Sequence, residues 1–145
     1  MAVLNKLEVH AHFLLRIALA SVFIYHGWSK LSDISGFAQM MGLPTIVAAL
    51  VTAAEILGGV GILAGGLMKN DLITRLSGLV IVPVMLGAIF LVHWPRWNFM
   101  ISESHPAGGM EFQVVLLLIA LYFLIVGNGV SAKEPKIIPK QGVLT

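Results

Sequence analysis

The chain has 145 residues, of which 58% are hydrophobic and only 11% are charged, and its mean hydropathy is +0.94. A soluble domain of this size needs a larger charged fraction to cover its surface, so the composition excludes an ordinary soluble protein. The net charge of +2 comes without a basic patch, which excludes a nucleic-acid partner. Because the chain has no cysteine, it cannot perform thiol chemistry or ligate an iron–sulfur cluster by itself.

Four apolar runs are long enough, or nearly so, to cross the roughly 30 Å hydrocarbon core of a bilayer. They cover about residues 12–28, 44–68, 72–94 and 111–126. The first run contains Arg16 and no small-residue cleavage site follows it, which favours a retained helix over a signal peptide. The sequence therefore predicts an all-α membrane protein, an antiparallel bundle of four transmembrane helices over residues 1–129, followed by a polar cytoplasmic tail over 130–145.

The connections between these runs differ in length. Residues 68–71 form a tight turn, so the second and third helices are expected to be antiparallel neighbours. Residues 31–43 are expected to lie along the membrane interface as a short helix, and residues 95–110 form a longer loop that suits a lid or docking segment. Pro83 is expected to kink the third helix. Gly61 and Gly65 in the second run are spaced for close helix packing.

Lysine and arginine residues orient the bundle. The side of the termini carries Lys6, Lys69, Arg75, Lys133, Lys136 and Lys140, and the other side carries only Lys30 and Arg96. The positive-inside rule then places both termini in the cytoplasm of a multi-pass protein of the inner, or plasma, membrane.

Two charged residues fall inside the predicted membrane spans. Arg16 lies a turn or so into the first helix, and Glu55 lies about 16 Å into the second, at 1.5 Å per residue. Because the two helices run antiparallel, we expect an Arg16–Glu55 ion pair near mid-depth. Such a pair either fixes the helix register or contributes to binding a ligand.

A second group of ionisable residues is expected at the outer end of the bundle. His26 and Lys30 are four apart on one helix face, His93 ends the third helix, and Glu111 begins the fourth. Together they could bind a polar head group and move protons, with the histidines in catalysis. The alternative is an ordinary polar interface in which Lys30 extends to water. No spacing motif supports a haem or metal site, although His26 and His93 are the residue types that such a site would use.

Several short motifs follow one another along the chain, namely Arg16, the segments 26–31, 55–59 and 88–93, and Gly108 to Phe112. In this order they resemble the DoxX family of small four-helix membrane proteins. The resemblance covers about residues 14–131. The sequence departs from the family's pattern at Ala20, where glycine is frequent, and at Lys133, where an acidic residue is expected.

The resemblance implies a role near quinones, because some DoxX-like proteins resemble the membrane subunit of a thiosulfate:quinone oxidoreductase. Others are linked to membrane-associated oxidative-stress complexes. We therefore expect a quinone-interacting subunit of a membrane redox complex, with quinone as cofactor and with other subunits, or further copies of the chain, as partners. Electrons would have to come from elsewhere, so the chain need not be an enzyme by itself. The alternative is a non-enzymatic scaffold or a carrier of a small hydrophobic molecule.

Overall fold

The computed structural model describes residues 2–129, and the side chains of residue 7 and of residues 10–129 within that range. Its elements are α1 (Ala2–Leu31), α2 (Ile34–Met41), α3 (Thr45–Leu67), α4 (Asp71–Ala88), the π-helical turn η1 (Ile89–His93) and α5 (Glu111–Val126). Residues 2–129 contain no strand, so the all-α prediction is confirmed. The predicted tail, with Lys133, Lys136 and Lys140, lies outside the described residues.

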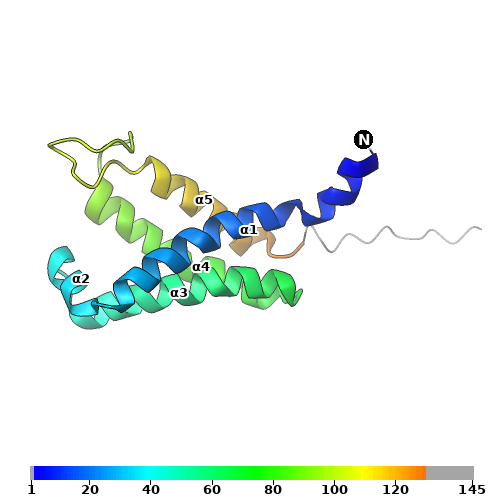
Figure 1. Cartoon of the computed structure of the whole chain (residues 1–145), viewed down its shortest axis with the longest axis horizontal. Helices are drawn as coiled ribbons and strands as arrows, with labels where there is room; N and C mark the ends of the chain where they lie inside the picture. Colours follow the sequence, from blue (N-terminus) through cyan, green and yellow to red (C-terminus); the bar gives the residue numbers. More distant parts are fainter. Residues whose placement is uncertain (1, 130–145) are drawn as a thin grey trace, which may run out of the picture.

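The four long helices run back and forth along the long axis of the molecule (Figure 1). α1 packs against α3, α3 against α4, and α4 against α5. Long helices that follow one another in the chain are therefore neighbours in space. The N-terminus and the end of α5 lie toward one end of the molecule. The short helix α2 and the loop of residues 95–110 lie toward the other end (Figure 1).

Local capping interactions determine where the helices begin and end. The Asp33 side chain accepts a hydrogen bond from the Gly36 amide at 2.8 Å and begins α2, the short helix expected between the first two long ones. α2 ends at Gly42, whose φ of 62° is the left-handed conformation that glycine adopts without strain. Asn70 caps α4 in the same way as Asp33 caps α2, with Ile73 as its donor. The turn before α4 is therefore as tight as predicted.

Glycine permits the close approach of α3 to α4. A Cβ on Gly61 would lie 2.1 Å from the Ser77 hydroxyl, and one on Gly65 would lie 2.7 Å from the Thr74 amide nitrogen. Both distances are far below van der Waals contact. The Gly61 and Gly65 motif is therefore used for helix packing, as small-residue motifs commonly are.

Large apolar side chains are found both inside and outside the helix assembly. The buried core contains Leu19, Phe23, Ile62, Ile81, Met85, Leu116, Ala120 and Phe123. Many others, such as Leu14, Leu57 and Ile125, are about 70% exposed, which is typical of a surface that contacts lipid. Two segments, Thr45–Leu67 and Asp71–His93, are long and apolar enough to cross a membrane, whereas the apolar α5 has 16 residues. By this measure, the described residues contain two of the four predicted spans.

Arg16 is fully buried and is bound by neutral oxygen atoms. Its guanidinium donates to the Ile62 carbonyl at 2.5 Å, to the Thr74 hydroxyl at 3.1 Å and to the Asn128 side-chain oxygen at 2.5 Å. Its charge also lies 4.6 Å from the centre of the Phe123 ring. These contacts join α1, α3, α4 and the residues after α5 in one network.

The predicted Arg16–Glu55 ion pair is wrong. On α3, Arg16 lies beside Gly66, whereas Glu55 lies beside Gly27 of α1. Gly66 is 11 residues beyond Glu55, which corresponds to about 16 Å along a helix. The prediction counted residues from the ends of the apolar runs and so placed both charges at the same depth in the membrane. The position of α1 along α3 instead depends on the close contacts of Gly27 with α3 and of Gly66 with α1.

Replacing Arg16 by methionine should destabilise the protein strongly. Three acceptors lose a donor, but Asn128 Oδ1 still accepts from the Thr74 hydroxyl. Two acceptors without this donor, at roughly 1–3 kcal/mol each, give an expected loss of about 2–6 kcal/mol. The check is thermal unfolding of the purified variant in detergent. Arg96→Met is the matched control, because Arg96 donates to Ser102 in the outer loop and should matter much less. Equal midpoints for Arg16→Met and wild type would contradict the role of this network.

Candidate functional site

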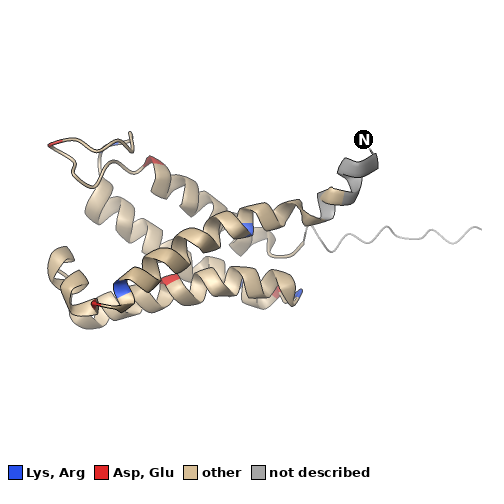
Figure 2. Ribbon diagram, viewed as in Figure 1, with Lys and Arg blue, Asp and Glu red and all other residues tan. Residues whose placement is uncertain are grey.

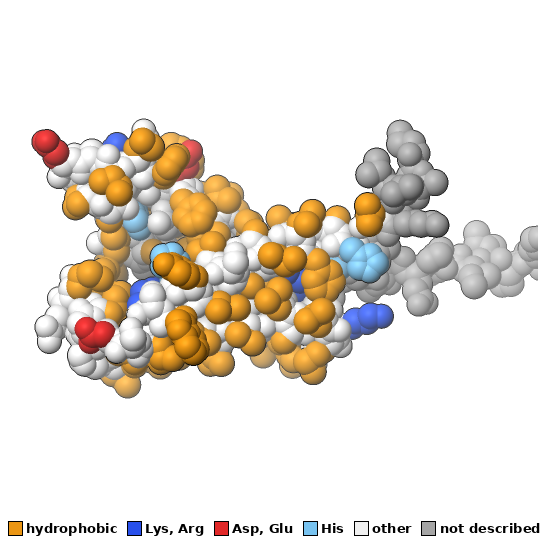
Figure 3. All heavy atoms as spheres, in the orientation of Figure 1, with side chains coloured by type: hydrophobic (Ala, Val, Ile, Leu, Met, Phe, Trp, Pro, Cys, Tyr) orange, Lys and Arg blue, Asp and Glu red, His pale blue; other side chains and the backbone are white. Residues whose placement is uncertain are grey.

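A cavity of about 410 Å³ opens at the end of the molecule where α2 lies. Its lining residues come from α1, α2 and α3 on one side and from α4, η1 and α5 on the other. This end of the molecule has two arms. One is α2 with the adjoining ends of α1 and α3, and the other is the loop of residues 95–110 with the start of α5 (Figure 1). Figure 3 shows a hollow between the two arms, with histidine side chains on both sides of it. The volume lies within the range of roughly 300–1,000 Å³ that is usual for small-molecule sites.

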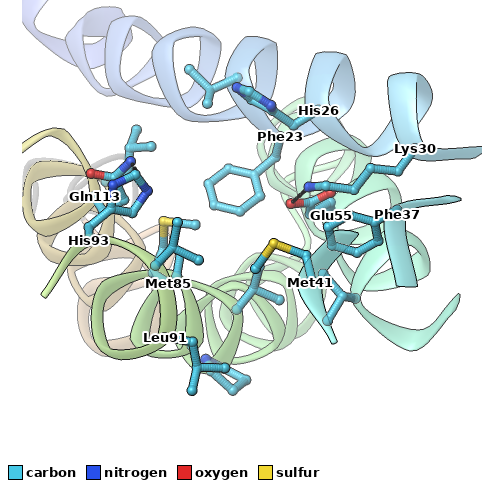
Figure 4. Close-up of a pocket in the computed structure, with 18 of the residues that line it drawn as sticks. Phe23, His26, Lys30, Phe37, Met41, Glu55, Met85, Leu91, His93 and Gln113 are labelled. Atoms are coloured by element: carbon cyan, nitrogen blue, oxygen red, sulfur yellow. Dashed lines mark hydrogen bonds and ion pairs between the residues drawn. The ribbon is translucent and has the colours of Figure 1, made fainter. Parts of the chain in front are cut away.

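Most of the cavity wall is apolar. Aromatic rings and methionines surround the space in Figure 4, among them Phe23, Phe37, Met41 and Met85. Phe37 and Met41 are four residues apart on α2, so one face of this short helix closes part of the cavity. Gly87 also lines the cavity, and a Cβ there would meet no heavy atom within 4 Å. Such walls suit a flat apolar molecule.

An ion pair lies at one edge of this apolar space. Lys30 Nζ on α1 donates to Glu55 Oε1 on α3 at 2.5 Å, and their side chains are 19% and 5% exposed. Figure 2 shows a basic segment of α1 close to an acidic segment of α3 near the end of the molecule where α2 lies. Gly27 allows the approach, because any Cβ on it would lie 3.1 Å from Glu55 Cβ. Lys30 is thus the partner of Glu55, in the place that the sequence had assigned to Arg16.

The ion pair leaves one oxygen unused. Glu55 Oε2 is buried and has no hydrogen-bond partner among the described residues. The Lys30 ammonium also lies 5.0 Å from the centre of the Phe37 ring. The site therefore holds a positive group and an unpaired acceptor side by side.

His93 and Gln113 form a polar pair on the opposite wall, where Figure 4 shows them together. His93 Nδ1 lies 3.1 Å from the Gly108 carbonyl oxygen, and His93 Nε2 lies 2.9 Å from Gln113 Nε2. A carbonyl can only accept, so Nδ1 must carry the proton, and in a neutral ring Nε2 then accepts from the Gln113 amide. The turn η1 delivers His93 to this position, and π-helical turns are frequent at functional sites.

The structure brings together three of the four residues predicted for the outer cluster. His26, Lys30 and His93 all line the cavity, and His26 is exposed at its edge beside Phe23 (Figure 4). Glu111 is not among the lining residues. Its carboxylate instead accepts a hydrogen bond from the Phe99 amide at 3.3 Å, which ties the outer loop to the start of α5.

Arg16 lies outside this site, whereas Glu55 lies inside it. Arg16 does not line the cavity, and its network joins the opposite ends of the helices. Among residues 2–129, no group of three or more histidine, cysteine or acidic side chains is arranged to hold a metal ion. A ligand of this cavity would therefore be held by the ion pair, the histidines and the apolar walls.

Sequence reasoning missed Gln113, and a signal for it was present. Gln113 is an amide within the otherwise apolar start of the last helix, and polar side chains in such runs commonly have a function. It also overlooked that Phe37 and Met41, at helical spacing, could form one wall. Nothing in the sequence indicated the open space at Gly87, because that space depends on how α4 lies relative to its neighbours.

Comparison with known proteins places the chain in a family. The DoxX family model matches residues 11–94, which is more than half of the chain. The chain is 30% identical over 135 residues to "Putative oxidoreductase CatD" of Bacillus subtilis (strain 168), covering 91% of this chain and 90% of that protein. No solved structure gives a significant match. DoxX proteins are membrane proteins, in keeping with the two apolar helices long enough to cross a bilayer. The chain therefore belongs to the DoxX family.

Proposed function

We propose that this protein binds a quinone-type ring in the cavity and serves as the quinone-interacting subunit of a membrane redox complex. The observation that carries the proposal is the cavity itself. It has apolar, partly aromatic walls, with the Lys30–Glu55 pair on one side and the His93–Gln113 pair on the other. A quinone has the complementary shape, namely a flat apolar ring with oxygen atoms at opposite ends.

The proposal assigns different tasks to the lining residues. Phe23 and Phe37 would contact the ring, and the Lys30 ammonium would donate to a ring oxygen, since only one of its three N–H groups is needed for Glu55. His26 is the exposed imidazole at the cavity edge, so it is the group best placed to exchange protons with water. His93 would orient Gln113 and hold the outer loop.

The electrons would come from another subunit or a soluble donor. The chain has no cysteine, and within residues 2–129 no group of three or more histidine or acidic side chains is arranged to hold a metal ion. The proposal therefore assigns the electron-carrying centre to the partner. The name of the similar B. subtilis protein, an oxidoreductase, supports a redox setting for such a partner complex. The competing proposal, a carrier or scaffold, has the same cavity but no electron donor.

The proposal includes a membrane orientation. α1, α3, the continuous α4 and η1 segment, and α5 would cross the bilayer alternately, with both termini on the cytoplasmic side and the cavity at the opposite face. Trp28, Trp94 and Trp97 support this arrangement, because all three are more than half exposed and belong to the cavity end, where tryptophan would lie among lipid head groups.

Reporter tags test this orientation directly. Tags fused to either terminus should report the cytoplasm, and a tag inserted in the exposed loop between Glu103 and Ser104 should report the opposite side. The measurement uses two reporters, one that is active only in the cytoplasm and one that is active only on the opposite side of the membrane. Finding the loop tag and the C-terminal tag on the same side would refute the alternating arrangement.

Filling the cavity tests the ligand. Gly87→Leu adds a side chain where a Cβ meets open space, and leucine favours helix over glycine, so the fold should be retained. We expect wild-type protein purified in mild detergent to contain extractable quinone and to bind a decyl-tailed benzoquinone, and Gly87→Leu to lose at least about tenfold in affinity, equal to ~1.4 kcal/mol.

The matched control is Ala18→Leu, which adds three carbon atoms instead of four, on an exposed face of α1 outside the cavity. It should bind the benzoquinone as wild type does. If wild-type protein contains no quinone and binds none, the quinone proposal fails. If it binds quinone but never accepts electrons from any membrane fraction, the carrier is the better description.

A further inference from the structure

The unpaired oxygen of Glu55 restricts what the cavity can bind. Glu55 is 4% exposed, and its Oε2 atom has no hydrogen-bond partner among the described residues. An ion-paired carboxylate accepts hydrogen bonds and donates none. A buried acceptor without a donor is unfavourable, so a ligand that supplies a donor gains more than one that does not.

Lys30 presents the opposite kind of group next to this oxygen. It donates to Glu55 Oε1, and Figure 4 shows its ammonium and the Glu55 carboxylate side by side at the edge of the cavity. The ammonium has three N–H groups and needs only one for that contact. The pair therefore offers a ligand one donor and one acceptor in neighbouring positions.

A hydroxyl group matches both positions, whereas a carbonyl matches only one. The hydroxyl oxygen can accept from Lys30 while its proton is donated to Glu55 Oε2. A quinone carbonyl can accept from Lys30, but it leaves Glu55 Oε2 unpaired. Apolar walls make the difference larger, because water does not compensate the unpaired acceptor inside them.

We infer that the cavity selects the reduced, hydroxylated form of its ring ligand, a hydroquinone, over the oxidised quinone, through the Lys30–Glu55 pair. This inference rests on the proposed function, since it specifies which redox form of a quinone-type molecule the site binds.

Binding of matched ligands under anaerobic conditions tests the inference. The probes are a decyl-tailed 1,4-benzoquinone, its hydroquinone, and the hydroquinone's 1,4-dimethyl ether, which keeps the ring and oxygens but has no hydroxyl proton. Equilibrium titration of the full-length protein in detergent should show the hydroquinone binding about tenfold more tightly, or better, than either of the other two.

Two variants separate hydrogen bonding from shape. In Glu55→Gln, Lys30 still needs an acceptor, so it pairs with the amide oxygen, and an N–H donor then replaces the unpaired oxygen. The preference for hydroquinone should disappear or reverse in favour of the quinone. The double variant Lys30→Met with Glu55→Leu removes both groups without leaving a buried charge, and it should lose most of the preference for hydroquinone. Gln113 Oε1, another buried acceptor in the cavity lining that has no partner within residues 2–129, is the same in both proteins. The double variant also tests the inference by itself if Glu55→Gln does not fold.

Glu103→Gln is the control, because it makes the same chemical change in the exposed outer loop. It should keep the wild-type preference. If wild-type protein binds quinone as tightly as hydroquinone or more tightly, the inference is overturned while the quinone proposal stands. If it binds none of the three probes, the proposed function fails as well. A preference for hydroquinone that persists unchanged in the double variant would also overturn the inference.

Discussion

The structure depends on how two charges are accommodated among apolar helices. Arg16 is fully buried and Glu55 nearly so, and removing either from water is costly unless partners replace the lost solvation. Arg16 is bound by three neutral oxygens from three different parts of the chain. Glu55 has one cationic partner and keeps an oxygen unpaired. Within the described part of the chain, each side chain keeps one polar atom unpaired, Arg16 Nε and Glu55 Oε2, but of the two only Glu55 lines the cavity. The charge of Arg16 is therefore used to join helices, whereas Glu55 can also contact a molecule in the cavity.

This difference explains why one end of the molecule is tight and the other is open. Near Arg16, Asn128 also binds Gly65 and Asp71, and Arg75 donates to the last carbonyls of α5. These bonds hold the end of α5 against the turn between α3 and α4. At the other end, comparable cross-links between α1 and α5 are absent from the described residues, and the cavity occupies the space between the two arms (Figure 3).

Much of the fold could be predicted from the sequence, but the register of α1 against α3 could not. Apolar runs located the long helices, and the expected convergence of helix ends agrees with the cavity for His26, Lys30 and His93. Which residues Arg16 and Glu55 contact depends on how far α1 is shifted along its axis relative to α3. A shift of one helical turn moves every contact by about 5.4 Å. Close contacts at Gly27 and Gly66 determine this position. Counting residues from the ends of the apolar runs does not reveal these contacts. Asn128 was missed for a related reason, since it lies beyond the last helix and reaches back to Gly65.

The two polar pairs of the cavity are chemically unequal, and this bears on which histidine acts. In the neutral His93 ring, one nitrogen donates to Gly108 and the other accepts from Gln113, so both are already occupied. Direct contact with a ligand would require His93 to give up its bond to Gly108 in the outer loop or its bond to Gln113 on α5. His26 has no such constraint, because it is exposed at the cavity edge on the same helix as Lys30. Under the proposed function, the arrangement therefore favours His93 as the residue that holds the wall in shape. It favours the α1 side, with His26, Lys30 and Glu55, as the side that would contact a ring ligand.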